Sequence, residues 1–521
     1  MRVSFRIHLI AVLGLSIATT SRAFESQPIA ITANGTLVGI RNSHYDQDFF
    51  LGVPYAQPPM GHLRYNHPQP VNQSWSRRPV TAYGPWCHSA PLNLPGFSQT
   101  GFPHNESEDC LTLNVVRPSK AHRNLNLPVL VWIYGGGFQE GGSADQRYNM
   151  SFLVRESVKM GSPIIGVSFN YRLSGFGFLP GRAVGESGTA NLGLYDQRLA
   201  LHWVKENIAA FGGDPSRVTI SGESAGACSV GQHFLAYSGR DDGLFRAGIA
   251  ESGGPVNSSP FLSLDEQDVL YDGVLNKTEC DTAVDTLECL RSTDVETLKA
   301  AFQGGLFTPV IDGDMIPNYP SVSLQEGRFV RRPILIGANT NEGTSIAASV
   351  GGLGINGSAD FRTLIARLWP GIANATIEII ADEYLNNLSE EEVEEGLGTV
   401  MPSPGPEYGA LYGRVTLWQG DVMFISGRRH AAEVWSQHGV PAYSYCFDTV
   451  PNGIDPGILG VTHFQEVPYM FRNYDGVGFA INRLASNFTD VRQGRHAVSN
   501  LMSRMWISFT NEMSPNAHQG N

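Results

Sequence analysis

The chain has 521 residues, of which 42% are hydrophobic and 16% are charged, a composition typical of a globular protein with a sizeable core. Its 36 basic and 49 acidic side chains give a net charge of −13 at pH 7. We therefore expect neither nucleic acid nor an anionic membrane surface as a partner, because both attract basic proteins. Six cysteines are too few to hold a chain of this length together, so the core must supply the stability.

The first 23 residues have the pattern of a secretory signal peptide. Arg2 and Arg6 precede the apolar run 9–17, and the segment closes on the small residue Ala23. The run is shorter than the roughly 20 apolar residues that span a bilayer. We expect cleavage near Ala23 and a secreted, extracellular protein without a stable membrane anchor. Removal of the segment takes away three arginines and no acid, which leaves 33 basic and 49 acidic side chains and a net charge of −16.

Ten Asn-x-Ser/Thr sequences are candidate glycosylation sites, in keeping with secretion. Chance alone would produce several in a chain of this length. The candidates are Asn34, Asn72, Asn105, Asn149, Asn257, Asn276, Asn356, Asn374, Asn387 and Asn487.

The cysteines leave their pairing open, and an oxidising compartment permits some disulfides. Cys280 and Cys289 bracket a short segment and could close a small loop. Cys87 and Cys110 bracket a longer stretch that is rich in Pro, Gly and Ser. The two others lie in apolar surroundings, and we interpret both as buried thiols outside any disulfide: Cys228 and Cys446.

Apolar runs with strand character recur along the chain and alternate with helical patterns. In 193–211, Leu194, Leu201 and Val204 recur at helical spacing. Strands that alternate with helices predict an α/β fold with a mostly parallel sheet covered on both faces. Because no linker or repeat divides the chain, we expect one large domain, 24–521, with insertions. The predicted strands are 129–134, 164–170, 218–221, 247–250, 334–337 and 442–447.

The first of these strands runs directly into Gly135, Gly136, Gly137 and Phe138. A flexible linker is an unexpected feature immediately after an apolar strand. Without side chains, the backbone N–H groups can approach a substrate oxygen, as the donors of an oxyanion hole must. We assign the N–H groups of Gly136 and Gly137 to this role.

The pentad Gly-Glu-Ser-Ala-Gly at 222–226 lies between a predicted strand and a predicted helix. Such a pattern is common by chance, but at a sharp strand-to-helix turn it exposes the serine as a nucleophile. Glycines at Gly222 and Gly226 leave room where a Cβ would clash. The helix N-terminus directs N–H groups and the positive end of its dipole at Ser224, so we add Ala225 to the oxyanion hole.

A serine nucleophile needs a base and an orienting acid. In folds that carry the serine at such a strand-to-helix turn, the acid comes next along the chain and the basic histidine follows it. Glu342 stands at the carboxyl end of the strand 334–337, and we prefer it to Asp312 and Asp314, whose Asp-Gly-Asp sequence is typical of a structural turn. His463 is our candidate base because it falls in a loop beyond the strand 442–447. The other downstream histidines lie in helical patterns, at a helix end or in the tail: His430, His438, His496 and His518.

The acidic segment 388–397 predicts a solvent-exposed helix that Ser389 caps together with Glu392. We interpret it as a charged surface rather than a metal site.

Seven stretches spread over nearly the whole chain after residue 23 form a specific set. They are FLGVPYAQPPMGHLR (50–64), SEDCLTLNV (107–115), VWIYGGGF (131–138), NYRLSGFGFL (170–179), NLGLYDQRLALHWVKENIAAFGGDPSRVTISGESAG (191–226), ANTNEG (338–343) and GVTHFQE (460–466). Together they resemble the type-B carboxylesterase and cholinesterase-like family of α/β-hydrolases, and above all its secreted fungal carboxylesterases and lipases.

The resemblance implies the α/β-hydrolase fold, with loop and helix insertions around the active-site gorge, and a serine carboxylic-ester hydrolase. Ser224, Glu342 and His463 would be the catalytic triad, and the glycine run and Ala225 would form the oxyanion hole. Ser252, in AESGGP, would support the acidic member from behind. The resemblance also implies two disulfides, Cys87 with Cys110 and Cys280 with Cys289. The reaction needs neither a metal nor an organic cofactor.

The first disulfide loop departs from two branches of the family. Cholinesterases carry a choline-binding tryptophan there, and the 22 residues between Cys87 and Cys110 contain none, so we do not expect choline esters as substrates. In the fungal lipases the loop is a long apolar lid. We expect a reduced lid here and a preference for short- to medium-chain acyl esters. Four apolar side chains of the loop could line an acyl site: Leu92, Leu94, Phe97 and Phe102.

Other functions stay open. A natural-product esterase or lactone hydrolase, or a triacylglycerol lipase, would carry the same triad, and only its substrates would distinguish it. A non-catalytic cholinesterase-like binding protein usually lacks a triad residue, whereas all three are present here. The sequence leaves the oligomeric state open and favours a monomer.

Overall fold

The computed structural model of the chain describes residues 27–92, 94–97, 104–121, 124–256 and 262–518. Three sequence predictions fall outside the described residues: the signal peptide at 1–23, the acyl-site residue Phe102 and the glycosylation candidate Asn257.

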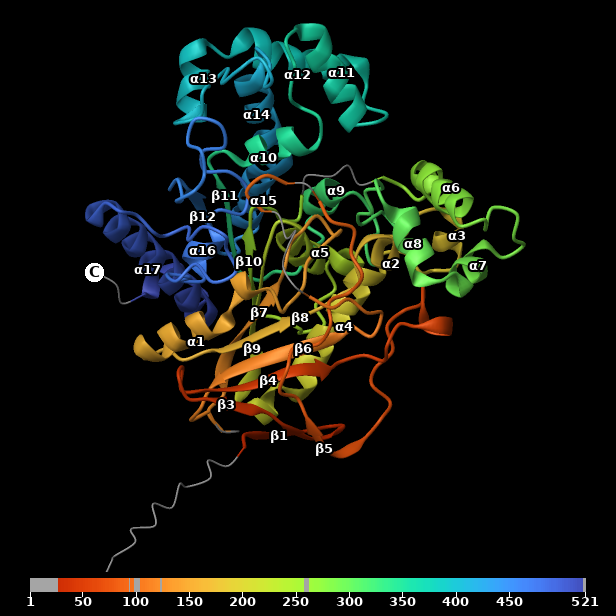
Figure 1. Cartoon of the computed structure of the whole chain (residues 1–521), viewed down its shortest axis with the longest axis vertical. Helices are drawn as coiled ribbons and strands as arrows, with labels where there is room; N and C mark the ends of the chain where they lie inside the picture. Colours follow the sequence, from red (N-terminus) through yellow and green to blue (C-terminus); the bar gives the residue numbers. More distant parts are fainter. Residues whose placement is uncertain (1–26, 93, 98–103, 122–123, 257–261, 519–521) are drawn as a thin grey trace, which may run out of the picture.

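Within the described residues, nine strands form the central sheet (Figure 1). The six strands from β12 to β8 are parallel, and β6, β4 and β3 continue the sheet with antiparallel pairings. From one edge to the other they are β12 (Ala442–Phe447), β11 (Ile334–Asn339), β10 (Ala247–Glu251), β9 (Gly213–Glu223), β7 (Leu127–Ile133), β8 (Ile165–Phe169), β6 (Thr112–Pro118), β4 (Gln47–Pro54) and β3 (Ile40–Asn42).

The predicted mostly parallel sheet is confirmed, and each of the six predicted apolar runs forms one of the parallel strands. Every residue of β7, β8, β10 and β11 is buried, which explains why these runs are continuously apolar instead of alternating. A second, three-stranded sheet lies beside the N-terminal part of the first (Figure 1). It contains β1 (Ile29–Thr32), β2 (Gly35–Val38) and β5 (Trp75–Pro79).

Helices cover both faces of the central sheet. On one face lie α4 (Leu192–Asn207), α5 (Ala225–Gly239) and α15 (Ser426–Gln437), joined by a Gln197–Ser229 hydrogen bond and a Phe234–Trp435 ring contact. On the other face, α1 (Met150–Lys159) and α17 (Thr489–Glu512) are joined by Arg504, which donates to Glu156. The parallel strands therefore end between two helical layers, and the loops at their carboxyl ends can carry a site.

Two groups of helices are inserted around the carboxyl ends of the parallel strands (Figure 1). The upper group follows α10 (Glu342–Ser349) and has a small apolar core of its own around Phe361, Ile365 and Trp418. It comprises α11 (Ser358–Leu368), α12 (Asn374–Asp382), α13 (Glu390–Leu397) and α14 (Tyr412–Gly420). The side group comprises α3 (Arg182–Glu186), α6 (Asp268–Lys277), α7 (Thr286–Ser292) and α8 (Val295–Phe302).

The predicted cap of the acidic helix α13 is present. The N–H of Glu392 donates to the Ser389 hydroxyl, and the N–H of Ser389 donates to the Glu392 carboxylate. The charges of this segment therefore start a helix and face solvent.

Both disulfides implied by the resemblance are present, Cys87–Cys110 and Cys280–Cys289. Cys228 is buried as expected, but the prediction that Cys446 is buried is wrong. Cys446 lies on β12, an edge strand of the sheet, where only one neighbouring strand covers it.

Nine of the ten glycosylation candidates lie in the described residues. Asn34 and Asn149 are partly buried and make local bonds: the Asn34 amide donates to the Val71 and Gln73 carbonyls, and the Asn149 side chain caps α1. The remaining seven asparagines are exposed: Asn72, Asn105, Asn276, Asn356, Asn374, Asn387 and Asn487.

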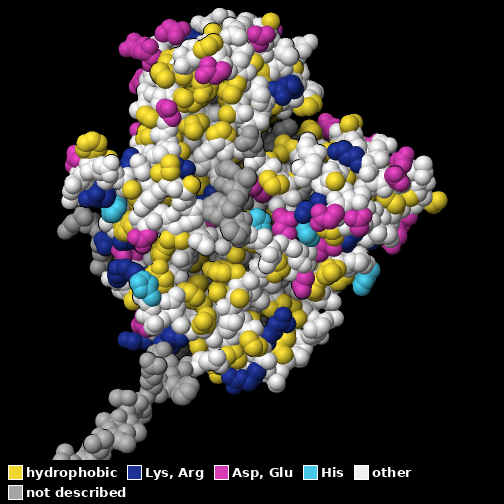
Figure 2. Space-filling model, in the orientation of Figure 1, with side chains coloured by type: hydrophobic (Ala, Val, Ile, Leu, Met, Phe, Trp, Pro, Cys, Tyr) yellow, Lys and Arg dark blue, Asp and Glu magenta, His cyan; other side chains and the backbone are white. Residues whose placement is uncertain are grey.

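On the face shown in Figure 2, basic side chains lie singly or in small groups among acidic ones. In the described part of the chain, no helix combines the length and the apolar character that crossing a bilayer requires.

Candidate active site

Ser224 occupies the sharp turn between β9 and α5. Its backbone has φ 57° and ψ −122°, a strained combination for a residue with a side chain. Its N–H donates to the carbonyl of Glu251 on the neighbouring strand, and its carbonyl accepts the first helical hydrogen bond, from Cys228. The turn therefore holds the hydroxyl beyond the carboxyl edge of the sheet.

The two glycines of the pentad make this turn sterically possible. A Cβ on Gly226 would lie 2.0 Å from the carbonyl oxygen of Ile133, and one on Gly222 would lie 2.5 Å from the carbonyl carbon of Gly226. Any larger residue would force α5 away from β7 and β9, so the prediction that these positions need room agrees with the geometry.

Glu342 and His463 reach Ser224 from two other loops. Nε2 of His463 lies 2.8 Å from the Ser224 hydroxyl, and Nδ1 lies 2.6 Å from Oε2 of Glu342. The other oxygen of Glu342 accepts from the backbone N–H of Asn339 at 2.7 Å, and the carboxylate is buried at the start of α10. With the ring proton on Nδ1, that N–H donates to Glu342 and Nε2 can accept the serine proton.

The imidazole also packs against an aromatic ring. Phe424 lies with its ring centroid 4.6 Å from that of His463. Phe424 belongs to a π-helical turn, Asp421–Ile425, between α14 and α15. Such turns insert an extra residue into a helix and often present a side chain at a site.

The glycine run lies next to the serine, since a Cβ on Gly135 would lie 2.9 Å from the Cβ of Ser224. Gly136 and Gly137 have φ values of 95° and 62°, which favour glycine. Among the described residues, their N–H groups donate no hydrogen bond to the protein. Together with the N–H of Ala225 at the start of α5, they are available to a substrate oxygen.

The rival acids and histidines are engaged elsewhere. Asp312 accepts from Asn191, and Asp314 accepts from the hydroxyl of Tyr195. His430 is exposed on α15, and the ring of His496 stacks on that of Tyr474. The others stand at the end of α15 and near the carboxyl terminus: His438 and His518.

A cavity of about 140 Å³ opens beside Ser224 and His463. Three of the four apolar loop residues proposed for an acyl site line it, namely Leu92, Leu94 and Phe97. Most of the lining is apolar, as expected for a site that holds an acyl chain. Further lining residues come from the loop after α8, from the end of α10 and from the π turn: Leu306, Thr308, Pro309, Ile346, Ser349, Val350, Met423 and Phe424. The oxyanion loop and the serine turn supply the others: Gly136, Gly137, Phe138, Glu223, Ala225 and Cys228.

Three further glutamates lie around the Glu342–His463 pair with no exposed surface, and the sequence interpretation missed them: Glu223, Glu251 and Glu466. Burial and the charges of neighbouring carboxyls raise the pKa of Glu223 and Glu251 well above the usual value. The same causes raise the pKa of Glu466 to about 7. The sequence does contain one signal for them, because each lies within three residues of a predicted site residue, in GESAG, AESGGP and THFQE.

Glu223 directly faces the base. Its Oε1 lies 3.3 Å from Nε2 of His463, and neither of its carboxyl oxygens accepts a hydrogen bond from a described residue. Burial and the neighbouring carboxyls raise the pKa of Glu223, which disfavours a negative charge beside Nε2 of His463.

Ser252 is connected to the acidic member through other residues. Its hydroxyl donates to Glu466 at 3.1 Å instead of to Glu342. The Asn339 amide donates to the second oxygen of Glu466 at 2.5 Å, and the Asn339 N–H donates to Glu342. A chain of hydrogen bonds therefore links Ser252 to Glu342 through Glu466 and Asn339.

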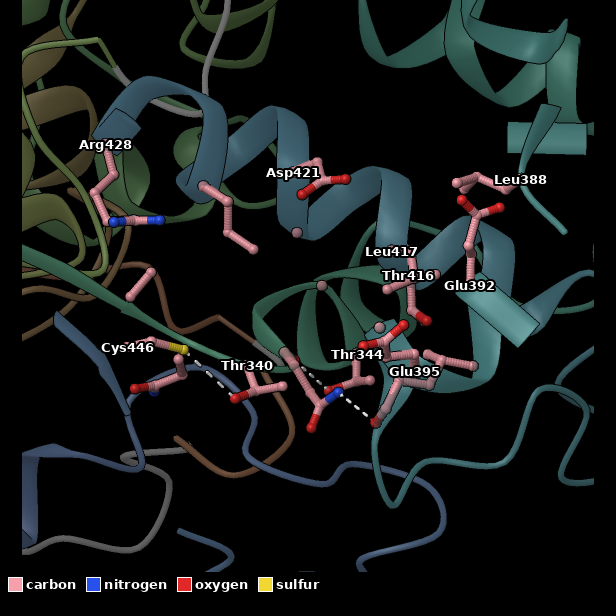
Figure 3. A pocket seen from close by; sticks show the side chains of 18 of the residues that line it. Thr340, Thr344, Leu388, Glu392, Glu395, Thr416, Leu417, Asp421, Arg428 and Cys446 are labelled. Atoms are coloured by element: carbon pink, nitrogen blue, oxygen red, sulfur yellow. Dashed lines mark hydrogen bonds between the residues drawn. The ribbon is translucent and has the colours of Figure 1, made fainter. Parts of the chain in front are cut away.

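A second, more polar cavity of about 430 Å³ lies behind the Glu342 loop (Figure 3). Asn341 and Gly343 line it, but neither Ser224 nor His463 does. The exposed Cys446 lines it as well, with its sulfur 3.7 Å from the Thr340 hydroxyl (Figure 3). This cavity therefore explains the exposure of the thiol and contains none of the three predicted triad residues.

The sheet order, the strand-to-helix serine turn and the order serine, acid, histidine define an α/β-hydrolase. A family model described as "Carboxylesterase family" matches residues 26–521, and the chain belongs to this family. It is therefore a carboxylic ester hydrolase by class, and the resemblance seen in the sequence is confirmed.

Individual relatives agree with this assignment. "Lipase 2" of Diutina rugosa is 30% identical over 96% of this chain and 90% of its own. "Secreted lipase 1" of Botryotinia fuckeliana is 41% identical over 57% of this chain and 56% of its own. The crystal structure of Aspergillus niger EstA superimposes with a TM-score of 0.80 and 30% identity, over 95% of this chain and 90% of that one.

Proposed function

We propose that the protein is a secreted serine esterase that cleaves short- to medium-chain carboxylic esters through an acyl-enzyme, with Ser224 as nucleophile, His463 as base and Glu342 as orienting acid. The observation that carries this proposal is the continuous contact from Glu342 through His463 to Ser224, 2.6 and 2.8 Å long, beside an apolar cavity.

In the first half of the reaction, Nε2 of His463 takes the proton of the Ser224 hydroxyl while the oxygen attacks the ester carbonyl. The N–H groups of Gly136, Gly137 and Ala225 donate to the oxyanion. His463 then gives its proton to the leaving alcohol, and the acyl group stays on Ser224. In the second half, His463 takes a proton from water, the hydroxide attacks the acyl-enzyme, and the acid leaves as Ser224 regains its proton.

Glu342 acts through the imidazole. Its carboxylate keeps the ring proton on Nδ1 and stabilises the imidazolium that forms in each half-reaction. Because its second oxygen is held by the Asn339 N–H, the carboxylate cannot rotate away from the ring.

The nucleophile is tested by Ser224→Ala. We expect the rate of p-nitrophenyl butyrate hydrolysis to fall by at least about 10³-fold, because only the oxyanion hole and substrate binding remain. Labelling by a fluorophosphonate probe should disappear, because the probe reacts with the serine oxygen. Ser216→Ala, at an exposed serine of the same strand, is the matched control and should keep full activity. Retained hydrolysis in folded Ser224→Ala would refute the proposal.

The acyl range rests on the first disulfide loop. Its described residues are tied to the protein: Ser345 donates to the Pro95 carbonyl at 2.6 Å and Arg147 to the Phe97 carbonyl at 2.6 Å. The described part of the loop, held in this way, restricts the cavity that it lines.

We therefore expect the highest kcat/KM on butyrate to octanoate esters and little change in rate when a triglyceride passes its solubility limit. The measurement is the rate of tributyrin and trioctanoin hydrolysis across that limit. A steep rise above it would instead favour a triacylglycerol lipase; the Diutina rugosa and Botryotinia fuckeliana relatives are named lipases.

Secretion is part of the proposal. It is supported by the signal-peptide pattern, the two disulfides and the name of the Botryotinia fuckeliana relative. Expression with residues 1–23 in a secreting host should release a protein whose N-terminus begins near Phe24.

A further inference from the structure

Gln139 and Glu140 follow the oxyanion loop and are almost completely buried, with exposed fractions of 1% and 3%. The N–H groups of both residues donate to the carbonyl of Gly136, at 2.9 and 3.1 Å. The pair is therefore fixed to the peptide that would hold the substrate oxygen. Neither side chain touches the predicted triad, so the mechanism above gives them no role.

Glu140 holds one side of the acyl cavity. Its Oε1 accepts the backbone N–H of Leu92 at 3.1 Å, and the Gln139 carbonyl accepts the N–H of Ala90 at 2.9 Å. The Leu92 side chain lines the cavity and covers the oxyanion loop so closely that a Cβ on Gly137 would lie 2.6 Å from it. The position of Leu92 therefore follows from the position of Glu140.

Gln139 holds another side. Its side-chain amide donates to the carbonyl of Phe307, in the loop after α8. The residues on either side of Phe307, Leu306 and Thr308, line the same cavity. Two consecutive side chains thus connect the oxyanion loop to two separate segments, 90–92 and 306–309.

We propose that Gln139 and Glu140 are positioning residues that set the usable length of the acyl cavity by fixing the segments 90–92 and 306–309 relative to the oxyanion loop. The proposal rests on the proposed esterase function and names what limits its substrates. A rigid cavity excludes acyl chains that are longer than the cavity, because its walls cannot move apart. The two hydrogen bonds therefore determine the preference between short- and long-chain esters.

The loop has other attachments that would survive the loss of these bonds. Beyond Leu92, the carbonyls of Pro95, Gly96 and Phe97 accept hydrogen bonds from Ser345, Gln465 and Arg147. Removal of the Glu140 acceptor should therefore release Leu92 without unfolding the loop.

The test is an acyl-length series of p-nitrophenyl esters, from acetate to dodecanoate, on the full-length protein and its variants. Glu140→Leu and Gln139→Leu keep the bulk and lose the hydrogen bond. A hydrogen bond of this kind is worth a factor of about 2 to 10, so each variant should raise the ratio of kcat/KM on octanoate to that on butyrate by about that factor. Glu140→Gln keeps an acceptor oxygen and should restore the native ratio.

Leu92→Ala supplies an independent arm. It should raise the same ratio by itself, and Glu140→Leu should add nothing when placed on Leu92→Ala, because the side chain that Glu140 positions is gone. Circular dichroism and Tm establish that each variant is folded. If Glu140→Leu does not fold, Glu140→Ala, which also lacks the acceptor oxygen, replaces it alone and on Leu92→Ala.

Ratios that stay within about twofold in all folded variants would overturn the proposal, and so would an equal loss on every ester, which indicates a structural role. In both cases the active native protein leaves the proposed function intact. A native protein without activity on any ester would instead refute the proposed function, and this inference with it.

Discussion

Two carboxyls approach the imidazole of His463 from different sides, and they differ in the hydrogen bonds that they accept. Glu342 accepts hydrogen bonds from Nδ1 of the ring and from the Asn339 N–H. Glu223 receives no such bond from the described residues, and burial raises its pKa. The hydrogen bonds therefore fix Glu342 against Nδ1, whereas burial disfavours a negative charge on Glu223 beside Nε2.

At the same scale, Glu342→Gln is the sharpest test of the orienting acid. The amide keeps the size of the carboxylate but favours the tautomer in which Nε2 carries the proton and cannot accept that of Ser224. We expect kcat on p-nitrophenyl butyrate to fall by about 10³- to 10⁴-fold, as for other triads that lose their acid.

The matched control is Asp314→Asn, at an acid that the sequence offered as an alternative. Its carboxylate bonds to Tyr195, away from the site, so activity should stay within about twofold of the native protein. Equal losses in both variants would show that the Glu342 result reflects damage to the fold. A large loss of activity in Asp314→Asn alone would indicate that Asp314, and not Glu342, is the orienting acid.

At the scale of elements, the join between β9 and α5 depends on close backbone contact. In Gly226→Ala the new Cβ would lie 2.0 Å from the Ile133 carbonyl oxygen, which belongs to backbone and cannot turn aside. We expect a loss of stability of about 1–3 kcal/mol or more and a larger proportional loss of activity, because the shift moves Ser224 and the Ala225 N–H. Thermal unfolding and esterase assays measure the two effects.

Gly273→Ala is the control for this substitution. Gly273 lies inside α6 with no atom within 4 Å of the added Cβ, so alanine should stabilise the helix by about 0.5–1 kcal/mol and leave activity unchanged. An active, stable Gly226→Ala would show that the elbow tolerates a displacement of α5, contrary to the packing described above.

The sequence predicted the elements whose patterns are local. Six apolar runs gave the six parallel strands, and the cap at Ser389 gave α13. Burial of a polar group is a different problem, because it depends on what other segments bring. Glutamate is ordinarily exposed, so nothing in a single strand indicates that Glu251 and Glu466 are buried together. The same reason explains Cys446, since an apolar neighbourhood in sequence does not show that β12 is an edge strand.

At the scale of the whole molecule, the site joins residues that are far apart in the chain. His463 meets Ser224 across 239 positions and Glu342 across 121. Periodicity carries no information over such separations. The prediction of these three residues came from the fixed order of a fold and from resemblance, whereas Gln139 and Glu140 had neither and were found only from their contacts.

The buried carboxyls also give the whole molecule a dependence on pH. Burial raises the pKa of Glu140 and of Glu466 to about 7, above the ordinary 4.5 of an unfolded chain. Between these values the folded state binds more protons than the unfolded state, so the free energy of unfolding falls as pH rises from about 4.5 to about 7. Glu106 has the opposite effect. Burial alone would raise its pKa, but hydrogen bonds from His88, Ser89 and Lys299 to the carboxylate lower the pKa to about 2. The stability that Glu106 contributes is therefore lost only as pH falls below about 4.5.

We therefore expect a Tm several degrees lower at pH 8 than at pH 5, measured by calorimetry at constant ionic strength. Glu140→Gln should reduce this difference, because an amide takes up no proton when it is buried on folding. At about 1.4 kcal/mol for each of the roughly 2.5 pH units between its two pKa values, Glu140 accounts for at most about 3.5 kcal/mol. A native Tm that rises from pH 5 to pH 8, or a difference that Glu140→Gln leaves unchanged, would mean that these carboxyls ionise in the folded protein as easily as in the unfolded chain.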